Sequence, residues 1–312
     1  MLDTEKFIEE KVEWLRNKIG GEKAVAAVSG GVDSMTTAVL GHRAIGDRQI
    51  AVFLDDGLMR EGEPAKVLKI LKKIGVNAKI YEVSDNFFKA LKGIPDPEEK
   101  RKAFRETFYR TLADVAGELR ARFLLQGTIA ADIVETAGGV KTQHNVLEQI
   151  GIRTLEKYGF EVLEPIKDLY KPQVRQVARA LGLPKEVFER RPFPGPGLSV
   201  RIIGEVTPER VEIVRKATEI VEEETKDIAC FQAFAVLMND RGTGITPDRK
   251  RKYGDIVVIR VVESEDAMKA KAAELPWEKL NKIKKRIIED LPSVTHVLYD
   301  LTDKPPATIE FE

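Results

Sequence analysis

The chain has 312 residues, a length typical of about two domains. Its 51 Lys and Arg residues balance its 51 Asp and Glu residues, so the formal net charge is zero. This balance argues against a protein that binds nucleic acid through a basic excess, and against one held at a membrane by a polybasic face. No window approaches the roughly 18 apolar residues of a membrane span, and the acidic amino terminus lacks a signal core. We therefore expect a cytoplasmic enzyme or binding protein.

Two further features of the composition narrow the class of protein. Charged residues make up 33% of the chain, above the ~25% of an ordinary soluble domain, whereas Asn and Gln are scarce. This combination suggests a heat-adapted source. The single cysteine, Cys230, excludes an internal disulfide and any zinc site built from several cysteines.

The first part of the chain alternates short apolar runs with stretches of helical period. The runs that we interpret as buried strands are residues 23–28, 50–56, 78–83 and 123–128, and the stretches that predict helices include residues 3–19, 35–46 and 97–121. Strands that alternate with helices in this way predict a doubly wound parallel sheet of the α/β class. Ligands bind such sheets beyond the carboxyl ends of the strands, where the breaks SGGVDS, DDG and QGT fall.

A cluster of prolines and glycines, RPFPGPGLSV, is the best candidate for a domain boundary because it interrupts any periodic element. It predicts a nucleotide-binding domain at residues 1–190 and a substrate-binding domain at 191–312. Beyond it the pattern predicts helices at 207–224 and 276–291 and strands at 230–238, 255–264 and 295–301. Thr207 is the expected N-cap of the first helix. The second domain is therefore expected to be a smaller α+β domain with an antiparallel or mixed sheet.

The segment SGGVDS stands between a predicted strand and a predicted helix, where backbone N–H groups and a helix amino terminus bind phosphate. Gly30 and Gly31 allow the backbone to approach oxyanions closely, and Ser29 and Ser34 add hydroxyl donors. Asp33 is unusual here because a carboxylate repels phosphate unless a cation lies between them. Mg²⁺ prefers carboxylate and phosphate oxygens and would supply that cation. The alternative is a tight turn in which Asp33 caps the helix.

SGGVDS is similar to the pyrophosphate-binding loop of the ATP pyrophosphatase superfamily, whose members cleave ATP between the α and β phosphates and adenylate a substrate. Longer segments are similar to the ATP-pyrophosphatase part of GMP synthetase, from about residue 20 to the end of the chain. These segments are VFLDDGLMR, DPEEKRKAF, QGTIAADIVET, the HN of KTQHN, ALGLP, RPFPGPGL and KPPATIEFE. The resemblance implies conversion of xanthosine monophosphate (XMP) to GMP with ATP, Mg²⁺ and ammonia.

The nucleotide site implied by this resemblance extends beyond the loop. The second strand would supply backbone donors and apolar cover for adenine, and the end of the fourth strand would approach the nucleotide. The expected ATP-binding residues are Ser29, Gly30, Gly31, Val32, Asp33, Ser34, Val52, Phe53, Leu54, Gly127 and Thr128, with Mg²⁺ held by Asp33. Asp55 and Asp56 are either sugar or metal ligands or polar residues of a turn.

The resemblance also implies a lid that carries catalytic residues after the fourth strand. Asp132 and Glu135 share a face if this stretch is helical, and Lys141 is a cation that would move onto phosphate. The alternative is a solvated loop with ordinary charges. The sequence departs from the family pattern just beyond, around His144, which is equally well explained as a structural residue.

The XMP-binding residues that the resemblance implies come from four parts of the chain. They are Arg101, Pro194, Gly195, Pro196, Gly197, Gln232, Lys304, Ile309 and Glu310. Arg101 and Lys304 would pair with the 5′-phosphate, whereas Gln232 and Glu310 would hydrogen-bond ribose or the base edge. Periodicity alone favours another interpretation of KPPATIEFE, as a carboxyl-terminal edge strand behind a proline bend.

Glutamine is the usual nitrogen source of the family, but no glutaminase domain precedes SGGVDS. Cys230 lies in the apolar segment IACFQAF and is best explained as a small buried hydrophobe. We therefore expect either free ammonium or a separate glutamine amidotransferase subunit, and the resemblance implies a homodimer formed through the second domain. The rival hypotheses are a tRNA-thiolating enzyme, an NAD synthetase and a non-catalytic adenine-nucleotide sensor.

Overall fold

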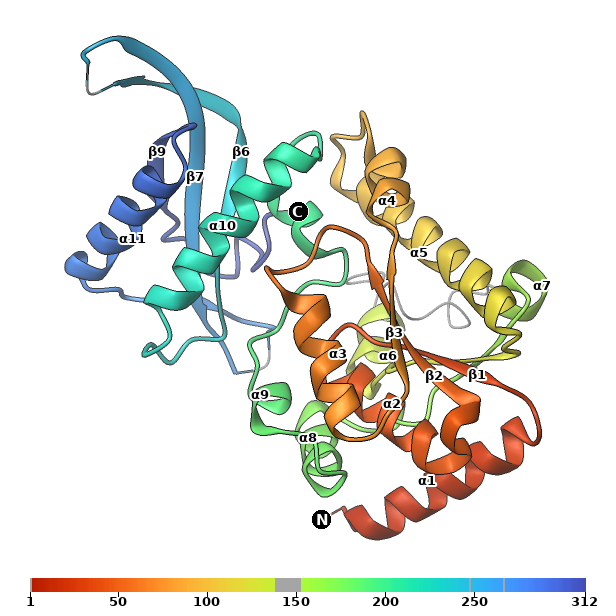
Figure 1. The fold of residues 1–312 in the computed structure, drawn as a ribbon. Coiled ribbons are helices and arrows are strands. Elements are labelled where there is room, and N and C mark those ends of the chain that lie inside the picture. Colours follow the sequence, from red (N-terminus) through yellow and green to blue (C-terminus); the bar gives the residue numbers. More distant parts are fainter. Residues whose placement is uncertain (1, 138–152, 247, 266) are drawn as a thin grey trace. The chain divides into compact units, whose positions relative to one another are not determined.

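The computed structural model describes residues 2–137, 153–246, 248–265 and 267–312 (Figure 1). The chain divides into two compact units. The first unit comprises Met1–Asp56, Gly62–Ser84 and Arg105–Arg190, and the second comprises Gly57–Glu61, Asp85–Phe104 and Arg191–Glu312. The Pro-Gly segment thus opens the longest stretch of the second unit, to which two shorter stretches from the first part of the sequence also belong.

A five-stranded parallel sheet forms the centre of the first unit. Its strands are β1 (Ala24–Ala27), β2 (Gln49–Asp55), β3 (Ala78–Glu82), β4 (Phe123–Leu125) and β5 (Glu161–Leu163), in the spatial order β3-β2-β1-β4-β5. The chain adds strands on one side of β1 and then returns to its other side, so the order reverses between β1 and β4. This arrangement confirms the predicted doubly wound sheet, and it places the switch point, where ligands bind in such sheets, at the ends of β1 and β4.

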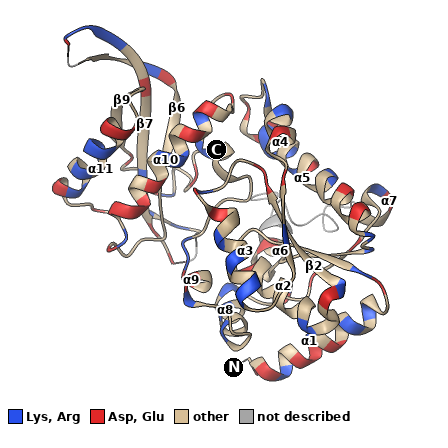
Figure 2. Ribbon diagram, in the orientation of Figure 1, with Lys and Arg blue, Asp and Glu red and all other residues tan. Residues whose placement is uncertain are grey.

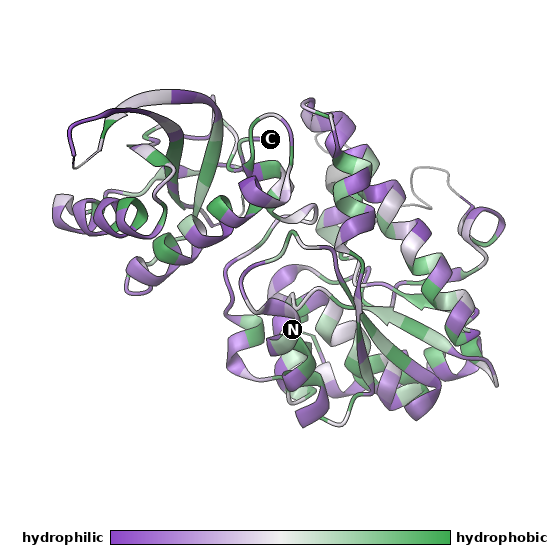
Figure 3. Ribbon diagram, turned by 45° about the horizontal axis from the view of Figure 1, so that its top comes forward, coloured by the Kyte–Doolittle hydropathy of each residue, from purple (hydrophilic) through white to green (hydrophobic). Residues whose placement is uncertain are grey.

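Helices lie on both faces of this sheet. They are α1 (Thr4–Ile19), α2 (Val32–Ile45), α3 (Glu63–Lys73), α6 (Ala130–Ala137), α7 (Thr154–Tyr158), α8 (Lys171–Ala180), α9 (Lys185–Phe188), the 3-10 turn η1 (Gly46–Arg48) and most of α5 (Pro97–Leu119). Leu124 packs with Tyr109 and Leu112 of α5, whereas the next residue, Leu125, lies against Gly41 of α2. Because successive strand residues point to opposite faces, α5 and α2 cover opposite sides of the sheet. Figure 3 shows the apolar strands between helices with polar outer faces.

The second unit is built on a mixed sheet, as predicted. Its strands are β6 (Gln232–Ile245), β7 (Arg251–Glu263), β8 (Lys271–Ala272) and β9 (Val294–Tyr299), and its helices are α4 (Ser84–Leu91), α10 (Pro208–Glu224), α11 (Trp277–Asp290) and the 3-10 turn η2 (Gly197–Arg201). The central strand, β7, pairs antiparallel with β6 and β8 and parallel with β9. The Thr207 side chain accepts the N–H of Arg210 and so caps α10, which confirms the expected N-cap.

Three parts of the sequence prediction differ from the structure. The strand expected at 230–238 begins two residues later and continues as a long hairpin strand to Ile245, past an irregularity between Leu237 and Arg241. The three-residue strand β5 was not predicted. The segment 304–312 forms no edge strand; only Lys304 makes an isolated bridge, to Ala270, and the rest is irregular.

Both signs of charge are interspersed along the helices (Figure 2). Among the described residues, no helix combines the length and the apolar character needed to cross a membrane.

The close packing of α2 on the sheet leads to a first prediction. A Cβ at Gly41 would overlap the Gln49 side-chain oxygen and Leu125 Cδ1, and Gln49 is fully buried. We expect Gly41→Ala to lower the free energy of unfolding by about 1–3 kcal/mol, although alanine is the better helix former. Denaturant unfolding followed by circular dichroism measures this change.

The matched control is Gly117→Ala on α5, where an added Cβ meets no atom within 4 Å. This variant should be neutral or more stable by up to ~1 kcal/mol. If both variants have the same unfolding free energy as the parent chain, the packing argument for Gly41 is wrong.

Candidate functional site

The predicted phosphate loop connects β1 to α2 at the switch point of the sheet. Gly31 is the N-cap residue of α2, and no side chain caps it, so the helix amino terminus is open to a ligand. Ser34 closes the loop, because its Oγ accepts the Ser29 N–H at 3.1 Å and donates to Gly31 O at 3.1 Å. The two serine hydroxyls lie 3.2 Å apart. The local structure is therefore a strand, a tight loop and a helix start, as anion binding by backbone N–H groups requires.

Two glycines let the chain pass closely through this region. Gly30 has a φ of +79°, in the left-handed region that glycine adopts without strain. Gly127 follows β4, and a Cβ there would lie 2.7 Å from Ser34 N and 2.8 Å from Asp33 C. The end of β4 thus lies directly against the start of α2, and the structure brings together the predicted residues of the loop and Gly127.

Asp33 lies at the start of α2 and is largely buried. Its Oδ2 accepts a hydrogen bond from Lys171 Nζ at 2.5 Å. Its Oδ1 is buried and has no hydrogen-bond partner among the described residues. Burial raises the pKa of Asp33, the charge of Lys171 opposes that rise, and the negative charge of Asp132 adds to it. Lys171 and Arg175 on α8 thus favour the charged carboxylate, whereas the charge of Asp132 on α6 disfavours it.

The residues present fit a magnesium ion. The unpartnered Oδ1 of Asp33 is a hard oxygen ligand. No group of three or more His, Cys, Asp or Glu side chains that could hold a metal occurs in the part of the chain that the structure describes. Mg²⁺ is commonly bound by one or two carboxylates together with substrate phosphates, so a single carboxylate beside an anion-binding loop suits it.

Lys171 is a residue of this site that the sequence analysis missed. It is the first residue of α8, where a positive side chain is disfavoured because the helix amino terminus carries partial positive charge. A lysine in that position, followed by Pro172, was a signal that could have singled it out. Its pairing with Asp33 means that the loop carboxylate already has one cationic partner from the protein itself.

The other predicted nucleotide residues lie at or near the ends of the same strands. Val52, Phe53 and Leu54 are buried within β2, and the last pair between β1 and β2 is Ala27 with Val52. β2 therefore extends beyond the end of β1 toward the loop side. Thr128 is fully buried, and its hydroxyl donates to Glu164 Oε1 at 2.6 Å.

The predicted catalytic acidic residues lie on α6. Asp132 and Glu135 are both within this helix, which confirms that the stretch is helical, and Asp132 Oδ2 accepts the Ile129 N–H at 3.0 Å. Lys141 and His144 lie outside the described residues.

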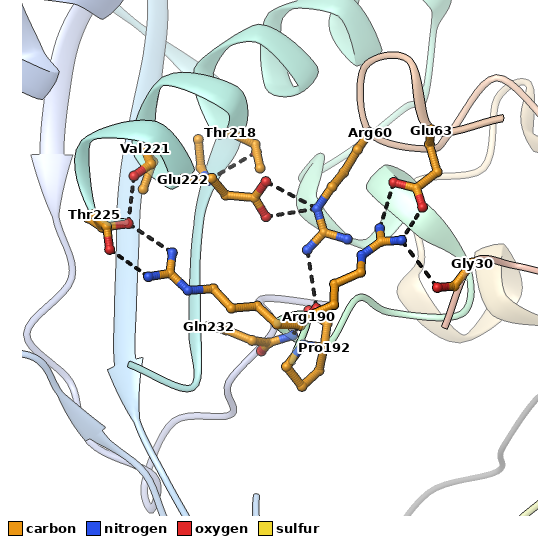
Figure 4. Close-up of polar contacts among 12 residues, drawn as sticks. Gly30, Arg60, Glu63, Arg190, Pro192, Thr218, Val221, Glu222, Thr225 and Gln232 are labelled. Carbon is orange, nitrogen blue, oxygen red and sulfur yellow. Dashed lines mark hydrogen bonds and ion pairs between the residues drawn. The ribbon is translucent and has the colours of Figure 1, made fainter. Parts of the chain in front are cut away.

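The predicted XMP-binding residues all belong to the second unit, although they come from distant parts of the chain. Glu310 is held by Arg201, whose Nε and Nη2 donate to its two carboxylate oxygens at 2.9 Å each. Gln232 Nε2 donates to Glu310 Oε1 and to Pro192 O, both at 3.1 Å. Figure 4 labels Gln232 and Pro192. The structure thus brings Gln232 and Glu310 together around Arg201, a residue that the sequence analysis missed.

Arg201 is almost fully buried, at 1% exposure, and its guanidinium stacks on the Phe193 and Phe234 rings. Arg201 Nη1 is buried and has no hydrogen-bond partner among the described residues. A buried cation with one unused donor beside Glu310 is a polar centre suited to a hydrogen-bonding ligand.

The remaining XMP predictions have identified neighbours in the second unit. Lys304 Nζ donates to Ala267 O at 2.8 Å, and Arg101 pairs with Glu98 one turn earlier on α5. Ile309 is buried in the apolar core of the unit. Gly197 has a φ of +62°, and a Cβ there would overlap the Leu58 backbone. Pro194, Gly195 and Pro196 lead into this turn and are partly buried.

Cys230 lies just before β6 rather than within a strand, and it is half-buried. Burial raises the pKa of its thiol. A protonated thiol is a weak nucleophile, so the environment of Cys230 does not resemble that of a catalytic cysteine.

Two family models match the chain. Residues 2–196 match the model described as "NAD synthase", and residues 218–311 match "GMP synthase C terminal domain". The solved structure of NMN synthetase from Francisella tularensis is similar to 64% of this chain and 79% of its own chain, with a TM-score of 0.50 and 16% identity. This likeness concerns the fold alone.

Curated relatives match over the whole length. Proteins named as one subunit of glutamine-hydrolyzing GMP synthase are 51% identical in Methanopyrus kandleri, with 100% of both chains covered, and 50% identical in Archaeoglobus fulgidus, again with 100% of both. The protein of the same name from Pyrococcus furiosus is 50% identical, over 99% of this chain and 97% of its own. With an anion-binding loop at the switch point of its sheet and full-length identity near one half, the chain belongs to this family of GMP synthase subunits.

Proposed function

We propose that the chain is the ATP-pyrophosphatase subunit of a two-subunit GMP synthase, a ligase that forms a C–N bond. It uses ATP to transfer AMP to the C2 oxygen of XMP, and ammonia then attacks C2 and expels AMP. The products are GMP, AMP and pyrophosphate. The observation that carries this proposal is the SGGVDS loop with its Asp33–Lys171 pair, in a chain that matches its GMP synthase relatives from end to end.

The chemistry explains why such a loop is needed. The C2 oxygen of a xanthine is a poor leaving group, and adenylation converts it into part of a good one. The departing pyrophosphate carries most of the developing charge. Backbone N–H groups at the start of α2, with the hydroxyls of Ser29 and Ser34 and the ammonium of Lys171, would stabilise that charge without reorganisation.

Mg²⁺ bound to ATP would be held by Asp33, whose Oδ1 is buried and unpartnered among the described residues. The ion supplies charge neutralisation of the phosphates when bound. Lys171 keeps Asp33 oriented through Oδ2. Asp132 and Glu135 on α6, together with Lys141, are proposed as catalytic residues of a lid that limits the access of water to the adenylated intermediate.

The adenine is proposed to lie along the carboxyl end of β2, against Val52, Phe53 and Leu54. XMP is proposed to bind the second unit. There Gln232 and Glu310, fixed by Arg201, would read the base or ribose, and Arg101 and Lys304 would pair with the 5′-phosphate. Ile309 and the turn Pro194–Gly197 would line the same site.

The nitrogen source is proposed to be ammonia delivered by a separate glutamine amidotransferase subunit. The relatives are named as one subunit of a glutamine-hydrolyzing enzyme, and the half-buried thiol of Cys230 has a raised pKa. A homodimer formed through the second unit and a cytoplasmic location complete the proposal. Exposed apolar side chains on that unit, among them Ile245, Tyr253 and Leu298, are compatible with such a dimer.

A substitution at Asp33 tests the role of the loop. We expect Asp33→Asn to fold normally but to lower kcat for XMP-dependent pyrophosphate release by about a hundredfold or more, because a preorganised electrostatic contact is lost. Chelation of Mg²⁺ should stop the parent enzyme in the same assay. Asp47→Asn, at an exposed position of the same unit, is the control and should keep full activity. Near-normal turnover of Asp33→Asn would refute the assignment of Asp33 as the magnesium ligand.

A second substitution tests the XMP site. Lys304→Met should raise KM for XMP by about tenfold or more, because a hydrogen bond between charged groups is lost, and should leave KM for ATP unchanged. The control is Lys271→Met, at an exposed lysine of β8. An unchanged KM for XMP in the Lys304 variant would remove this residue from the site.

The nitrogen source is tested with the purified chain alone. With ATP, Mg²⁺ and XMP, it should form GMP from ammonium salts but not from glutamine. Cys230→Ala should retain the ammonium-dependent rate, because this thiol takes no part in the reaction. GMP formation from glutamine by the chain alone, or loss of the ammonium-dependent rate in Cys230→Ala, would contradict the proposed division of labour between subunits.

A further inference from the structure

An ion pair between the buried Glu63 and the partly buried Arg190 lies directly behind the phosphate loop. Glu63 is the first residue of α3 and is only 4% exposed. Both of its carboxylate oxygens accept hydrogen bonds from the guanidinium of Arg190, with Nη2 at 2.6 Å from Oε2 and Nη1 donating to Oε1. Figure 4 shows this two-pronged contact beside Gly30. All three residues belong to the first unit.

The pair is in contact with the loop itself. Arg190 Nη1 lies 3.5 Å from Gly30 O and donates to it. A Cβ on Gly30 would lie 2.6 Å from Glu63 Oε1, 2.6 Å from Val67 Cγ2 and 2.9 Å from Arg190 Nη1. The loop therefore rests on the ion pair and on the first turns of α3 with no space between them.

Stability alone is a weak reason to keep such a pair. Taking two charges out of water costs free energy that their attraction often only offsets, and well-packed apolar side chains of similar volume commonly stabilise as well or better. An apolar pair cannot hold a hydrogen-bond donor in a fixed direction. The fork of Arg190 is locked by Glu63, and from that position one N–H reaches the carbonyl of Gly30.

That carbonyl belongs to the turn whose backbone must present its N–H groups to phosphate. Rotation of the backbone between Ser29 and Gly31 would redirect those donors. Gly30, with its left-handed φ, has no side chain whose packing would oppose such a rotation. The Ser34 hydroxyl accepts the Ser29 N–H and donates to Gly31 O, so it ties the two ends of the turn together. The contact with Arg190 restrains the Gly30 carbonyl between them.

We propose that Glu63 and Arg190 are positioning residues for the reaction, which hold the Gly30 turn in the geometry that binds the ATP phosphates. They touch neither substrate nor reacting atoms. This inference rests on the proposed function, since it assigns these residues to the same nucleotide site. It extends that site to two side chains that stand 127 positions apart in the sequence.

The test compares three variants by steady-state kinetics and thermal unfolding. Arg190→Gln should raise KM for ATP by about tenfold, with KM for XMP unchanged. Arg190→Lys keeps the charge but not the fork and should give an intermediate KM for ATP. The double variant Glu63→Leu with Arg190→Met removes both charges, so it should unfold near the parent temperature, yet its KM for ATP should remain about tenfold raised.

The double variant separates positioning from stability. A merely structural pair would give a double variant with parent-like stability and a parent-like KM for ATP, and that result would overturn the proposal. An equal rise in KM for ATP and for XMP would overturn it too, since it would indicate a general loss of structure. Glu186→Gln and Arg179→Gln, at exposed positions of the same unit, are controls and should behave as the parent.

Failure of this inference is distinguishable from failure of the proposed function. The parent chain must first form GMP and pyrophosphate from XMP, ATP and ammonium. If it does, the variants test Glu63 and Arg190 as described. If it does not, binding of MgATP to parent and double variant, measured by titration calorimetry, still tests the positioning role, with equal affinities refuting it.

Discussion

The first unit depends on one constraint, that a carboxylate is buried at a place where the backbone N–H groups are arranged to bind anions. Asp33 stands at the amino terminus of α2, close to the loop that would bind phosphate. Without a cation between them, the carboxylate and a phosphate repel each other. Lys171 supplies one such cation from α8 and occupies one carboxylate oxygen. The other oxygen has no hydrogen-bond partner among the described residues, so Lys171 offsets the charge of the loop carboxylate from one side only.

In the second unit, buried charges hold in place a segment that lacks regular secondary structure. The segment 304–312 forms no strand, yet it is fixed at two points. Arg201 holds Glu310, and Lys100, which is fully buried, holds Glu312 and donates to Ile202 O at 2.7 Å. Burial lowers the pKa of Lys100 and raises that of Glu312, and the attraction between the two groups opposes both shifts. The ion pairs thus fix the orientation of segment 304–312, because their hydrogen bonds are directional. An apolar contact such as that of Ile309 cannot do this alone.

The sequence predicts local features well because their causes are local. Alternating apolar runs and helical periods predict a doubly wound sheet and four of its five strands. The residues around Thr207 predict its N-cap, and the glycines of SGGVDS predict a tight turn. The three residues of β5 are too few to carry a periodic signal. The extension of β6 to Ile245 depends on pairing with β7 through Gly- and Arg-rich positions of low strand propensity.

The charged contacts of the candidate sites, in contrast, are not predicted by the sequence. Lys171 and Asp33 are 138 positions apart, Glu63 and Arg190 are 127 apart, and Arg201 and Glu310 are 109 apart. No pattern in a single sequence links such partners, because only the fold brings them together. What the sequence did provide was one member of two of these pairs, Asp33 and Glu310, whose residue types suggested chemistry before their partners were known.

These pairs also explain how a chain of zero net charge can suit substrates that carry several phosphates. Three cations at the candidate sites are each paired with a carboxylate, Lys171 with Asp33, Arg190 with Glu63 and Arg201 with Glu310. These three cations therefore add little to a general positive field of the kind from which nucleic-acid affinity largely comes. The donors of these three side chains are instead held in place by their carboxylate partners. Recognition then depends on the geometry of a few directed contacts, and that is why the positions of these side chains matter more than their number.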